Sequence, residues 1–352
     1  MKLILIVSLL HITQPNSVII FFQYSTQIKE KRMERNIALI GAGNWGKNHL
    51  RNLKNLGVLN SVLELSEEIT TLRKKDHPDV KFTSDEKNII NDPAIKGVVI
   101  AAPAHLHYEI AKKYLLAGKD ILVEKPLALK VDEGEELVRI AEENNRILMV
   151  GHILQYHAAV IRLKKLIDDG ELGELRYIYS NRLNIGKLRS EENVLWSFAP
   201  HDISLMLMLL GGEEPSDISA SGGAYINKKI YDTTLTTLKF DSGVRGHIFV
   251  SWLHPFKEQK LVVVGSEKMA VFDDVSQEKL FVYPHTIEIE EGNIPVAHKA
   301  DSEVVKFEPS QPLEEELKHF IKCIDSRDIP KTDGNEGVRV LRILNKAGQY
   351  LK

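Results

Sequence analysis

The sequence predicts an α/β chain of two domains: an N-terminal domain on a parallel sheet, then a C-terminal α/β domain with a large, mostly antiparallel open sheet. Three observations support this fold class. The length of 352 residues suits two domains of ordinary size. Up to Gly151, short apolar runs alternate with helical stretches, as in buried parallel sheets. Beyond it, runs of alternating apolar and polar residues follow one another, which is typical of antiparallel sheets.

Five short apolar runs and three helical stretches define the first domain, which we place at residues 34–152. Glycines such as Gly57 and Gly118 close the helical stretches, as helix C-termini often require. The expected strands are Asn36 to Ile40, Val62 to Leu65, Val98 to Ala102, Ile121 to Val123 and Ile147 to Val150. The expected helices are Asn48 to Leu56, Tyr108 to Ala117 and Asp132 to Asn144.

The second domain, residues 153–352, is expected to combine a sheet with helices at both ends of the segment. The expected helices are Ala158 to Asp168, Asp202 to Leu210, Leu313 to Asp325 and Asn335 to Leu351. The expected strands lie near Tyr177 and Ser219, and at Thr233 to Phe240, Gly243 to Trp252, Lys260 to Val264 and Met269 to Phe272. The order of these runs favours a mostly antiparallel sheet.

Residues 1–33 are expected to be a leader outside the fold. The apolar runs Leu3 to Leu10 and Val18 to Phe22 resemble a secretory signal. However, Gln14 to Asn16 interrupt them well short of the roughly 18 residues of a membrane span, and no small-residue cleavage site follows. Met33 stands directly before the first strand, so we favour an upstream extension and expect neither export nor stable membrane association.

Composition excludes several classes of protein. The 43% apolar and 27% charged content is ordinary for a globular chain, which excludes disorder and disulfide scaffolds. With 46 Lys plus Arg against 49 Asp plus Glu, the net charge is −3, so nucleic acid is not an expected partner. The single cysteine, Cys323, forms no internal disulfide and no thiolate metal cluster. We therefore expect a cytoplasmic protein.

The first motif is a glycine-rich turn after the first strand, made of Gly41, Ala42, Gly43, Asn44, Trp45 and Gly46. Gly41 permits the tight turn, Gly43 lets the backbone approach a pyrophosphate, and Gly46 allows close packing of helix on strand. Alone, the pattern also fits an ordinary turn. Glu64 follows Gly41 by 23 residues, the spacing of an acid that binds the adenosine ribose and repels a 2′-phosphate. Together they predict a Rossmann domain that binds NAD rather than NADP.

Two further motifs carry candidate catalytic groups. Lys125 lies between Glu124 and Pro126 at the carboxyl end of a predicted strand, where ligands bind in open α/β sheets. A surface Glu-Lys pair is the alternative interpretation. His201 follows Pro200, which we place at the start of an apolar helix, so that the imidazole lies at the helix mouth. Capping or packing is the alternative role for this histidine.

These residues together resemble the Gfo/Idh/MocA family of nicotinamide-dependent sugar oxidoreductases, over essentially Asn36 to Leu351. The segments that carry the resemblance are Gly41 to Gly46, Ala101-Ala102-Pro103 with His107, Glu124-Lys125-Pro126, Gly151-His152 and His201-Asp202. More narrowly, Gly151 to His157 and Asn181 to His201 resemble the branch that oxidises the 3-hydroxyl of UDP-N-acetylglucosamine or its uronic acid. The resemblance implies that the open sheet makes oligomer contacts, as in a homodimer or homotetramer.

The family roles carry over to matching positions. Lys125 and His201 are the implied catalytic pair, while Ser197 replaces the aspartate that many relatives have four residues before the histidine. The implied cofactor-binding residues are Gly41, Gly43, Asn44, Trp45, Gly46, Glu64, Ala102, Pro103, His107, Glu124 and Lys125. The implied substrate-binding residues are Tyr156, Arg182, Asn184, Arg189, Asn193 and His201, with arginine suited to a diphosphate.

The expected reaction is oxidation of a secondary alcohol by NAD. One group must take the hydroxyl proton and a positive donor must stabilise the developing alkoxide, and either Lys125 or His201 can be the base. No metal is expected, because His105, His107, His152 and His157 lack ligands at zinc spacing. The alternatives are an inositol or free-sugar dehydrogenase on the same fold, or a non-catalytic NAD-binding sensor.

Overall fold

The computed structural model describes residues 34–186, 188–189, 192–291 and 293–351, so the predicted leader lies outside the described residues. The first sheet has six parallel strands in the order β3-β2-β1-β4-β5-β6. They are β1 (Ile37–Ile40), β2 (Leu59–Leu63), β3 (Phe82–Thr83), β4 (Gly97–Ile100), β5 (Asp120–Glu124) and β6 (Leu148–Gly151). Their nearly continuous apolar sequences fit burial on both faces, which confirms the predicted parallel sheet.

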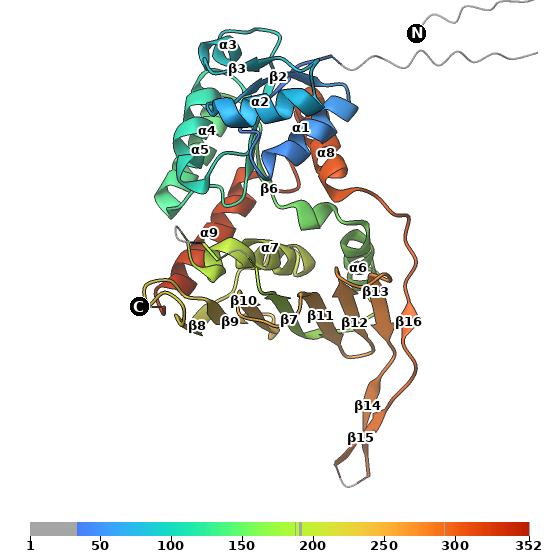
Figure 1. The fold of residues 1–352 in the computed structure, drawn as a ribbon. Coiled ribbons are helices and arrows are strands. Elements are labelled where there is room, and N and C mark those ends of the chain that lie inside the picture. Colours follow the sequence, from blue (N-terminus) through green and yellow to red (C-terminus); the bar gives the residue numbers. More distant parts are fainter. Residues whose placement is uncertain (1–33, 187, 190–191, 292, 352) are drawn as a thin grey trace, which may run out of the picture. The chain divides into compact units, whose positions relative to one another are not determined.

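Helices cover both faces of this sheet (Figure 1). The helices within the first domain are α1 (Gly46–Asn55), α2 (Glu67–Asp76), α3 (Lys87–Ile90), α4 (His107–Leu116) and α5 (Val131–Glu143), with the short 3₁₀ turn η1 (Ala104–Leu106). Leu50 and Leu53 of α1 pack with Ile37 and Leu39 on one face. The helices α4 and α5 pack on the other face.

The C-terminal segment returns to the first sheet. The helix α8 (Pro312–Ser326) buries Leu317 and Phe320 in the same cluster as α1. After it, Thr332 accepts a hydrogen bond at its carbonyl from the Val150 amide of β6 (2.8 Å). In packing, α8 therefore belongs to the first sheet although it follows the second in sequence.

The second sheet has eight strands in the order β16-β13-β12-β11-β7-β10-β9-β8, in which only β7 and β10 pair in parallel. The strands are β7 (Leu175–Leu183), β8 (Asp217–Gly223), β9 (Thr233–Lys239), β10 (Arg245–Ser251), β11 (Glu258–Gly265), β12 (Met269–Asp273), β13 (Leu280–Tyr283) and β16 (Glu303–Val304). This confirms the mostly antiparallel sheet expected for the second domain.

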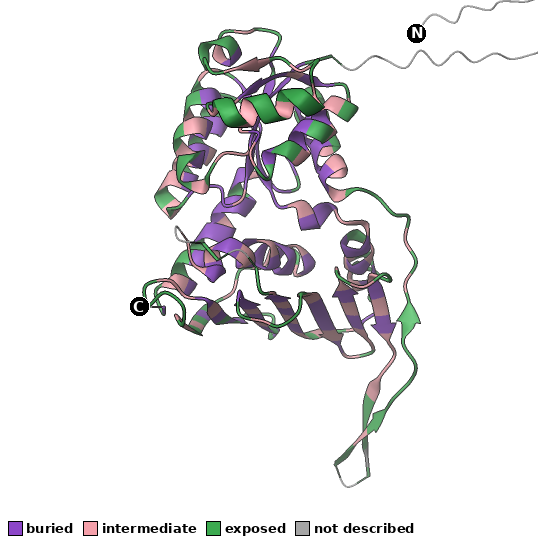
Figure 2. Cartoon of the chain, viewed as in Figure 1, coloured by how far each residue is buried: buried purple, intermediate pink, exposed green. Residues whose placement is uncertain are grey.

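One face of the second sheet is covered and the other is open (Figure 2). The covering helices are α6 (Ala158–Asp168), α7 (Val194–Leu209) and α9 (Gly334–Gly348), and the 3₁₀ turn η2 (Ile153–Tyr156) precedes α6. Ile178, Ile248 and Val263 point from the sheet into this core. A separate hairpin of β14 (Thr286–Glu290) and β15 (Ile294–His298) extends away from the sheet between β13 and β16 (Figure 1).

The start of α7 corrects one sequence expectation. The helix begins at Val194, with the Asn193 side chain accepting a hydrogen bond from the Trp196 amide (3.1 Å), and Pro200 lies inside it. The predicted start at Asp202 was therefore wrong, and His201 lies in mid-helix rather than at a helix mouth. An asparagine is a strong N-cap, and packing of the apolar helix tolerates the internal proline. In the described part of the chain, no helix is long and apolar enough to cross a membrane.

Candidate active site at the carboxyl ends of the first sheet

The glycine-rich turn lies where the strand order reverses between β1 and β4, the crevice in which open α/β sheets bind ligands. Gly41 has φ +85°, and a Cβ there would lie 2.9 Å from the Ala101 carbonyl oxygen at the end of β4. A Cβ at Gly46 would lie 2.1 Å from the Gly41 carbonyl oxygen. Only glycine fits these two positions, because one needs a left-handed backbone and both need close approach.

The residues of this turn fit a dinucleotide. A Cβ at Gly43 would meet no atom within 4 Å, so the outer side of the turn is open to a ligand. The helix α1 begins directly after it, without an acidic residue in its first turn and without a side-chain cap. The Lys47 and Asn48 amides already donate to the Gly43 and Trp45 carbonyls (3.1 and 2.8 Å), so the amides of the turn just before them are the groups suited to phosphate oxygens. The exposed Asn44 belongs to the same turn.

The predicted ribose-binding acid, Glu64, lies just beyond β2 beside this turn. Its carboxylate accepts hydrogen bonds from the Ala42 amide (2.8 Å) and the Ser66 amide (2.9 Å). Sequence reasoning missed Arg73 of α2, whose Nε donates to the Ala42 carbonyl (2.9 Å). Ala42 is thus held at both its amide and its carbonyl, which fixes the turn between two side chains of opposite charge.

Glu124 lies at the end of β5 and is buried among polar groups of α1. Its Oε1 accepts hydrogen bonds from the Trp45 indole and from His49 Nε2 (2.6 Å). Burial alone would raise the pKa of Glu124, but the hydrogen bond from His49 and its charge, with the Trp45 bond, hold that pKa below its usual value. The carboxylate is therefore ionised, and the Trp45 indole N–H is used within the protein.

Three predicted cofactor residues lie on the neighbouring loop. The ring nitrogens of His107 lie 2.9 Å from the Ala102 carbonyl and 2.7 Å from the Pro126 carbonyl. Burial lowers the pKa of His107, so the ring is neutral and its single N–H serves one of these carbonyls. Pro103 precedes η1 in an extended backbone conformation. His107 thus links the loop after β4 to the Lys125-Pro126 turn after β5, where the peptide bond is cis.

Lys125 and α7 meet in the crevice. The Lys125 ammonium donates to the Ser197 carbonyl of α7 (2.8 Å). Pro200 has no N–H for the Trp196 carbonyl, so the helix is irregular at the turn that faces Lys125. Burial lowers the pKa of Lys125, and the carboxylates of Glu192 and Glu124 offset part of this decrease.

His201 lies one helical turn after Ser197. Its Nδ1 is buried and has no hydrogen-bond partner among the described residues. Burial, with the nearby charges of Lys125 and Arg182, lowers the pKa of His201 well below its usual value. The structure therefore places a neutral imidazole one helical turn from the carbonyl that holds a lysine with a lowered pKa.

Arg182 of β7 is buried against Asp202 of α7. Its Nε and Nη2 donate to the two carboxylate oxygens (2.9 and 3.0 Å), and the Ser180 hydroxyl donates to the same carboxylate (2.6 Å). Burial opposes the charged guanidinium, but Asp202 outweighs it and raises the pKa of Arg182. The Gln259 amide, oriented so that its nitrogen donates to Asp274, accepts at its oxygen from Nη1 (3.3 Å), so all three guanidinium nitrogens have partners within the protein.

The other predicted substrate residues differ in what their side chains contact. The buried Asn184 Oδ1 has no partner among the described residues, whereas Asn193 caps α7. Arg189 is half exposed and pairs with Glu192 (2.9 Å). Tyr156 is buried in the core beside α8, with its hydroxyl 3.3 Å from the Thr332 hydroxyl. Asn184 and Arg189 are therefore the most available of these four for a ligand.

Sequence reasoning missed a buried polar group behind the crevice. His152 Nδ1 lies 2.5 Å from Glu336 of α9, and Gln155 donates to the other Glu336 oxygen (3.1 Å) and to the Ser204 hydroxyl (2.8 Å). This group joins η2, α7 and α9 where the two sheets meet. The described residues contain no cluster of three His, Cys, Asp or Glu side chains that could hold a metal.

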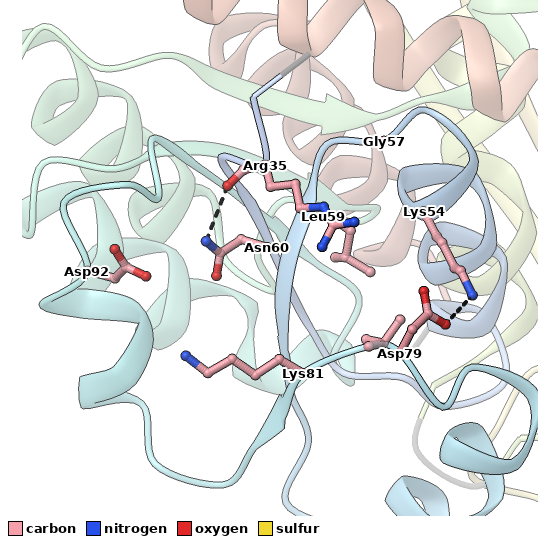
Figure 3. Close-up of a pocket in the computed structure, with 9 residues that line it drawn as sticks. Arg35, Lys54, Gly57, Leu59, Asn60, Asp79, Lys81 and Asp92 are labelled. Carbon is pink, nitrogen blue, oxygen red and sulfur yellow. Dashed lines mark hydrogen bonds and ion pairs between the residues drawn. The ribbon is translucent and has the colours of Figure 1, made fainter. Parts of the chain in front are cut away.

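A separate surface hollow of about 340 Å³ lies at the opposite, amino ends of β1 and β2 (Figure 3). Its lining residues include Arg35, Asn60 and Lys81, and the ion pair of Lys54 with Asp79 (2.6 Å) closes one side. Because ligands of such sheets bind at the carboxyl ends of the strands, this hollow is not the candidate site.

Comparisons with known proteins agree with this geometry. The family model described as an oxidoreductase family with an NAD-binding Rossmann fold matches residues 35–152, and the GFO/IDH/MocA C-terminal domain matches residues 160–271. UDP-N-acetylglucosamine 3-dehydrogenase of Acidithiobacillus ferrooxidans is 26% identical over 309 residues, 86% of this chain and 93% of that protein. Myo-inositol 2-dehydrogenase of Thermotoga maritima is 23% identical over 320 residues, 87% of this chain and 92% of that protein.

The solved structures show the same fold. A structure of the Acidithiobacillus ferrooxidans UDP-N-acetylglucosamine 3-dehydrogenase superposes with a TM-score of 0.78 at 23% identity, covering 90% of this chain and 98% of that one. Together, the two family models span the nucleotide crevice and most of the second sheet. The chain therefore belongs to the Gfo/Idh/MocA family and is an oxidoreductase with NAD as its cofactor.

Proposed function

We propose that this oxidoreductase oxidises the 3-hydroxyl of a UDP-N-acetyl-hexosamine, UDP-N-acetylglucosamine or its uronic acid, to the 3-keto nucleotide sugar. One observation carries the proposal: Lys125, directly after β5, donates to the Ser197 carbonyl of α7, one helical turn before His201, and its charge acts on that imidazole. The glycine-rich turn would hold a nicotinamide dinucleotide here, which would supply the hydride acceptor. The two side chains handle the proton.

The chemistry follows from the charge of the pocket. His201 is neutral because burial and the charges of Lys125 and Arg182 lower its pKa, so one of its ring nitrogens carries no proton and can accept one. The Lys125 ammonium donates to the Ser197 carbonyl and has further N–H groups for a substrate oxygen. Such a donor stabilises the alkoxide that forms as the proton and the hydride leave.

Two observations support a nucleotide sugar as substrate. Arg189 lies near enough to Lys125 for its charge to lower the lysine pKa, and its half-exposed guanidinium suits a diphosphate. The buried, unbonded Asn184 Oδ1 is an acceptor for the N–H of a sugar amide. The relative that acts on UDP-N-acetylglucosamine is consistent with this substrate class.

A second candidate substrate is a cyclic polyol such as inositol, because an inositol dehydrogenase is a relative over nearly the same length. Reduction of NAD, followed by nicotinamide absorbance, separates the candidates when UDP-N-acetylglucosamine, its uronic acid, myo-inositol and glucose are compared. We expect turnover with the UDP-sugars. Turnover with inositol alone would reassign the substrate, and NAD binding without turnover of any secondary alcohol would indicate a sensor.

The catalytic assignment is tested by two variants that keep the fold. Lys125→Met and His201→Asn should each lower kcat by about 100-fold or more, and the double variant should lose much less than the product because the two act as one unit. NAD affinity of His201→Asn should stay within about twofold of wild type. Near-wild-type oxidation by either single variant that still binds NAD would show that the assignment is wrong.

We also propose that the chain forms a homo-oligomer through the open face of the second sheet. Tyr179, Val262, Val271 and Phe281 are cross-strand neighbours in the register and point away from the covered face. Contiguous apolar patches on a soluble domain mark interaction surfaces. Sedimentation of the wild-type chain tests the proposal, and a monomer at all concentrations would refute it.

A further inference from the structure

The hairpin of β14 and β15 carries one apolar face. Cross-strand partners of an antiparallel pair project to the same side, and here Ile287 pairs with Ala297 and Ile289 pairs with Pro295. The other side carries Thr286 with His298, Glu288 with Val296, and Ile294 beside the turn. The first side is therefore wholly apolar, whereas the second mixes polar and apolar residues.

Within the part of the chain that the structure describes, this apolar face is exposed to solvent. Ile287 and Ile289 are 60% and 64% exposed, although isoleucine is among the most often buried residues. Among the strands that the structure describes, the hairpin pairs with no other, and it stands away from the eight-stranded sheet (Figure 1). An isolated two-stranded hairpin is marginally stable in water, so its apolar face needs a surface to cover it.

The chain itself carries a matching surface at the root of the hairpin. The row of outward side chains from Tyr179 through Val262 and Val271 to Phe281 ends at Val304 of β16, which is 44% exposed. A parallel row runs from Tyr177 through Val264 and Met269 to Tyr283. The hairpin leaves the sheet after Tyr283 and returns as β16, so the apolar half of the open face borders the hairpin.

We propose that the hairpin of one copy lies with its Ile287 and Ile289 face over the β11-β12-β13 side of the open sheet of a second copy. This inference rests on the proposed homo-oligomer and names the element that each copy exchanges. Suppose that the open faces of two copies pack together about a two-fold axis. The hairpin of each copy starts at the edge of its own sheet and then extends toward the sheet of the other copy. The contact is then made twice, as symmetry requires.

The dimensions and charges agree with this occupant. Five residues of strand span about 17 Å, the width of roughly three to four strands at about 4.8 Å spacing, which matches the apolar half of the sheet. The side of the hairpin opposite Ile287 and Ile289 carries the exposed Glu288. Glu291 lies at the tip. These carboxylates disfavour the negative surface of a membrane as the partner.

The test compares three variants of the full chain by sedimentation over a range of concentrations. Ile287→Glu/Ile289→Glu removes the apolar hairpin face, and Val271→Glu places a charge in the open sheet. Ile329→Glu is the matched control, because Ile329 is 80% exposed and lies outside both surfaces. Thermal melting and NAD binding confirm that each variant is folded.

We expect the hairpin variant to dissociate at a concentration at least about tenfold higher than wild type, with Ile329→Glu unchanged, since each isoleucine loses its buried contact. Amides of 286–290 and 294–298 should also lose protection from hydrogen exchange on dilution. If the hairpin variant assembles like wild type while Val271→Glu dissociates, the hairpin inference is overturned and the sheet contact stands. A wild-type monomer overturns both.

Discussion

Replacement of Asp202 by alanine should strongly destabilise the chain. Asp202 is 1% exposed, and its carboxylate accepts two hydrogen bonds from Arg182 and one from Ser180. Arg182 is itself only 9% exposed and cannot lose its charge. Without Asp202, the guanidinium remains buried between β7 and α7 without its hydrogen-bonded carboxylate, and only the more distant charge of Asp274 opposes its own.

The expected loss of unfolding free energy is about 3–5 kcal/mol, the usual cost of removing one partner of a buried ion pair. This is a large share of the roughly 5–15 kcal/mol that stabilises an ordinary domain. Equilibrium unfolding in urea, followed by circular dichroism and tryptophan fluorescence, measures the change. Agreement of the two probes tests whether the transition is two-state before a free energy is taken from it.

The matched control is Asp217→Ala, which breaks the exposed pair of Asp217 with Lys239 (2.6 Å, side chains 51% and 57% exposed). An exposed ion pair contributes about 0–1 kcal/mol, so this variant should unfold almost like wild type. The double variant Asp202→Leu/Arg182→Met should recover much of the stability because no charge is left buried. An Asp202→Ala variant as stable as the control would refute the reasoning that burial makes this pair indispensable.

Three further predictions concern the cofactor and pH. Glu64→Ala should reduce the preference for NADH over NADPH, because it removes the carboxylate beside Ala42, and titration of both cofactors measures the ratio. The kcat/KM for the sugar should fall as the pH drops through the pKa of the base, and this acid limb should lie below the usual histidine value because burial and the charge of Lys125 lower the pKa of His201. Burial and the charge of Glu124 raise the pKa of Glu316 well above its usual value. Wild type should therefore lose stability as the pH rises above about 4.5, where the unfolded carboxyl ionises, whereas Glu316→Gln should lack this slope in pH-dependent urea unfolding.

The first sheet could be predicted because the sequence of each strand by itself indicates that strand. A strand buried on both faces must be apolar throughout, so the run Ile121 to Val123 marks β5 to within one residue at each end. The glycine-rich turn is equally local, since Gly41 has a left-handed backbone conformation and Gly46 lies against the Gly41 carbonyl oxygen. Isoleucine and glutamate alternate at 287–290, which is the same kind of local signal, although β14 is not among the strands expected from the sequence.

The start of α7 was misplaced because two local signals competed. Pro200 has the fixed φ that suits a first helical turn, whereas Asn193 is a better N-cap seven residues earlier. The apolar packing of Val194, Leu195 and Ala199 in the core favours the longer helix. Burial of a whole face outweighed the preference of one proline.

The polar contacts of the site could not be predicted, because their partners are distant in sequence. His152 and Glu336 are 184 positions apart, and no periodic pattern in either helix or strand relates them. From the sequence, Arg182 was expected to bind the substrate diphosphate, but the fold pairs it with Asp202. Such pairings depend on how α7 and α9 pack between the two sheets.

The position of Ser197 shows why a missing carboxylate need not remove the alignment of the two proposed catalytic groups. Lys125 is held by the Ser197 backbone carbonyl, and a carbonyl is present whatever side chain the position carries. The same helix turn carries His201 and, next to it, Asp202, which ties α7 to β7 through Arg182. The helix α7 thus accepts the hydrogen bond of Lys125 from the first domain and carries His201 of the second. The spacing of the proton-handling groups is therefore set by backbone and by a buried ion pair, and not by the side chain at position 197.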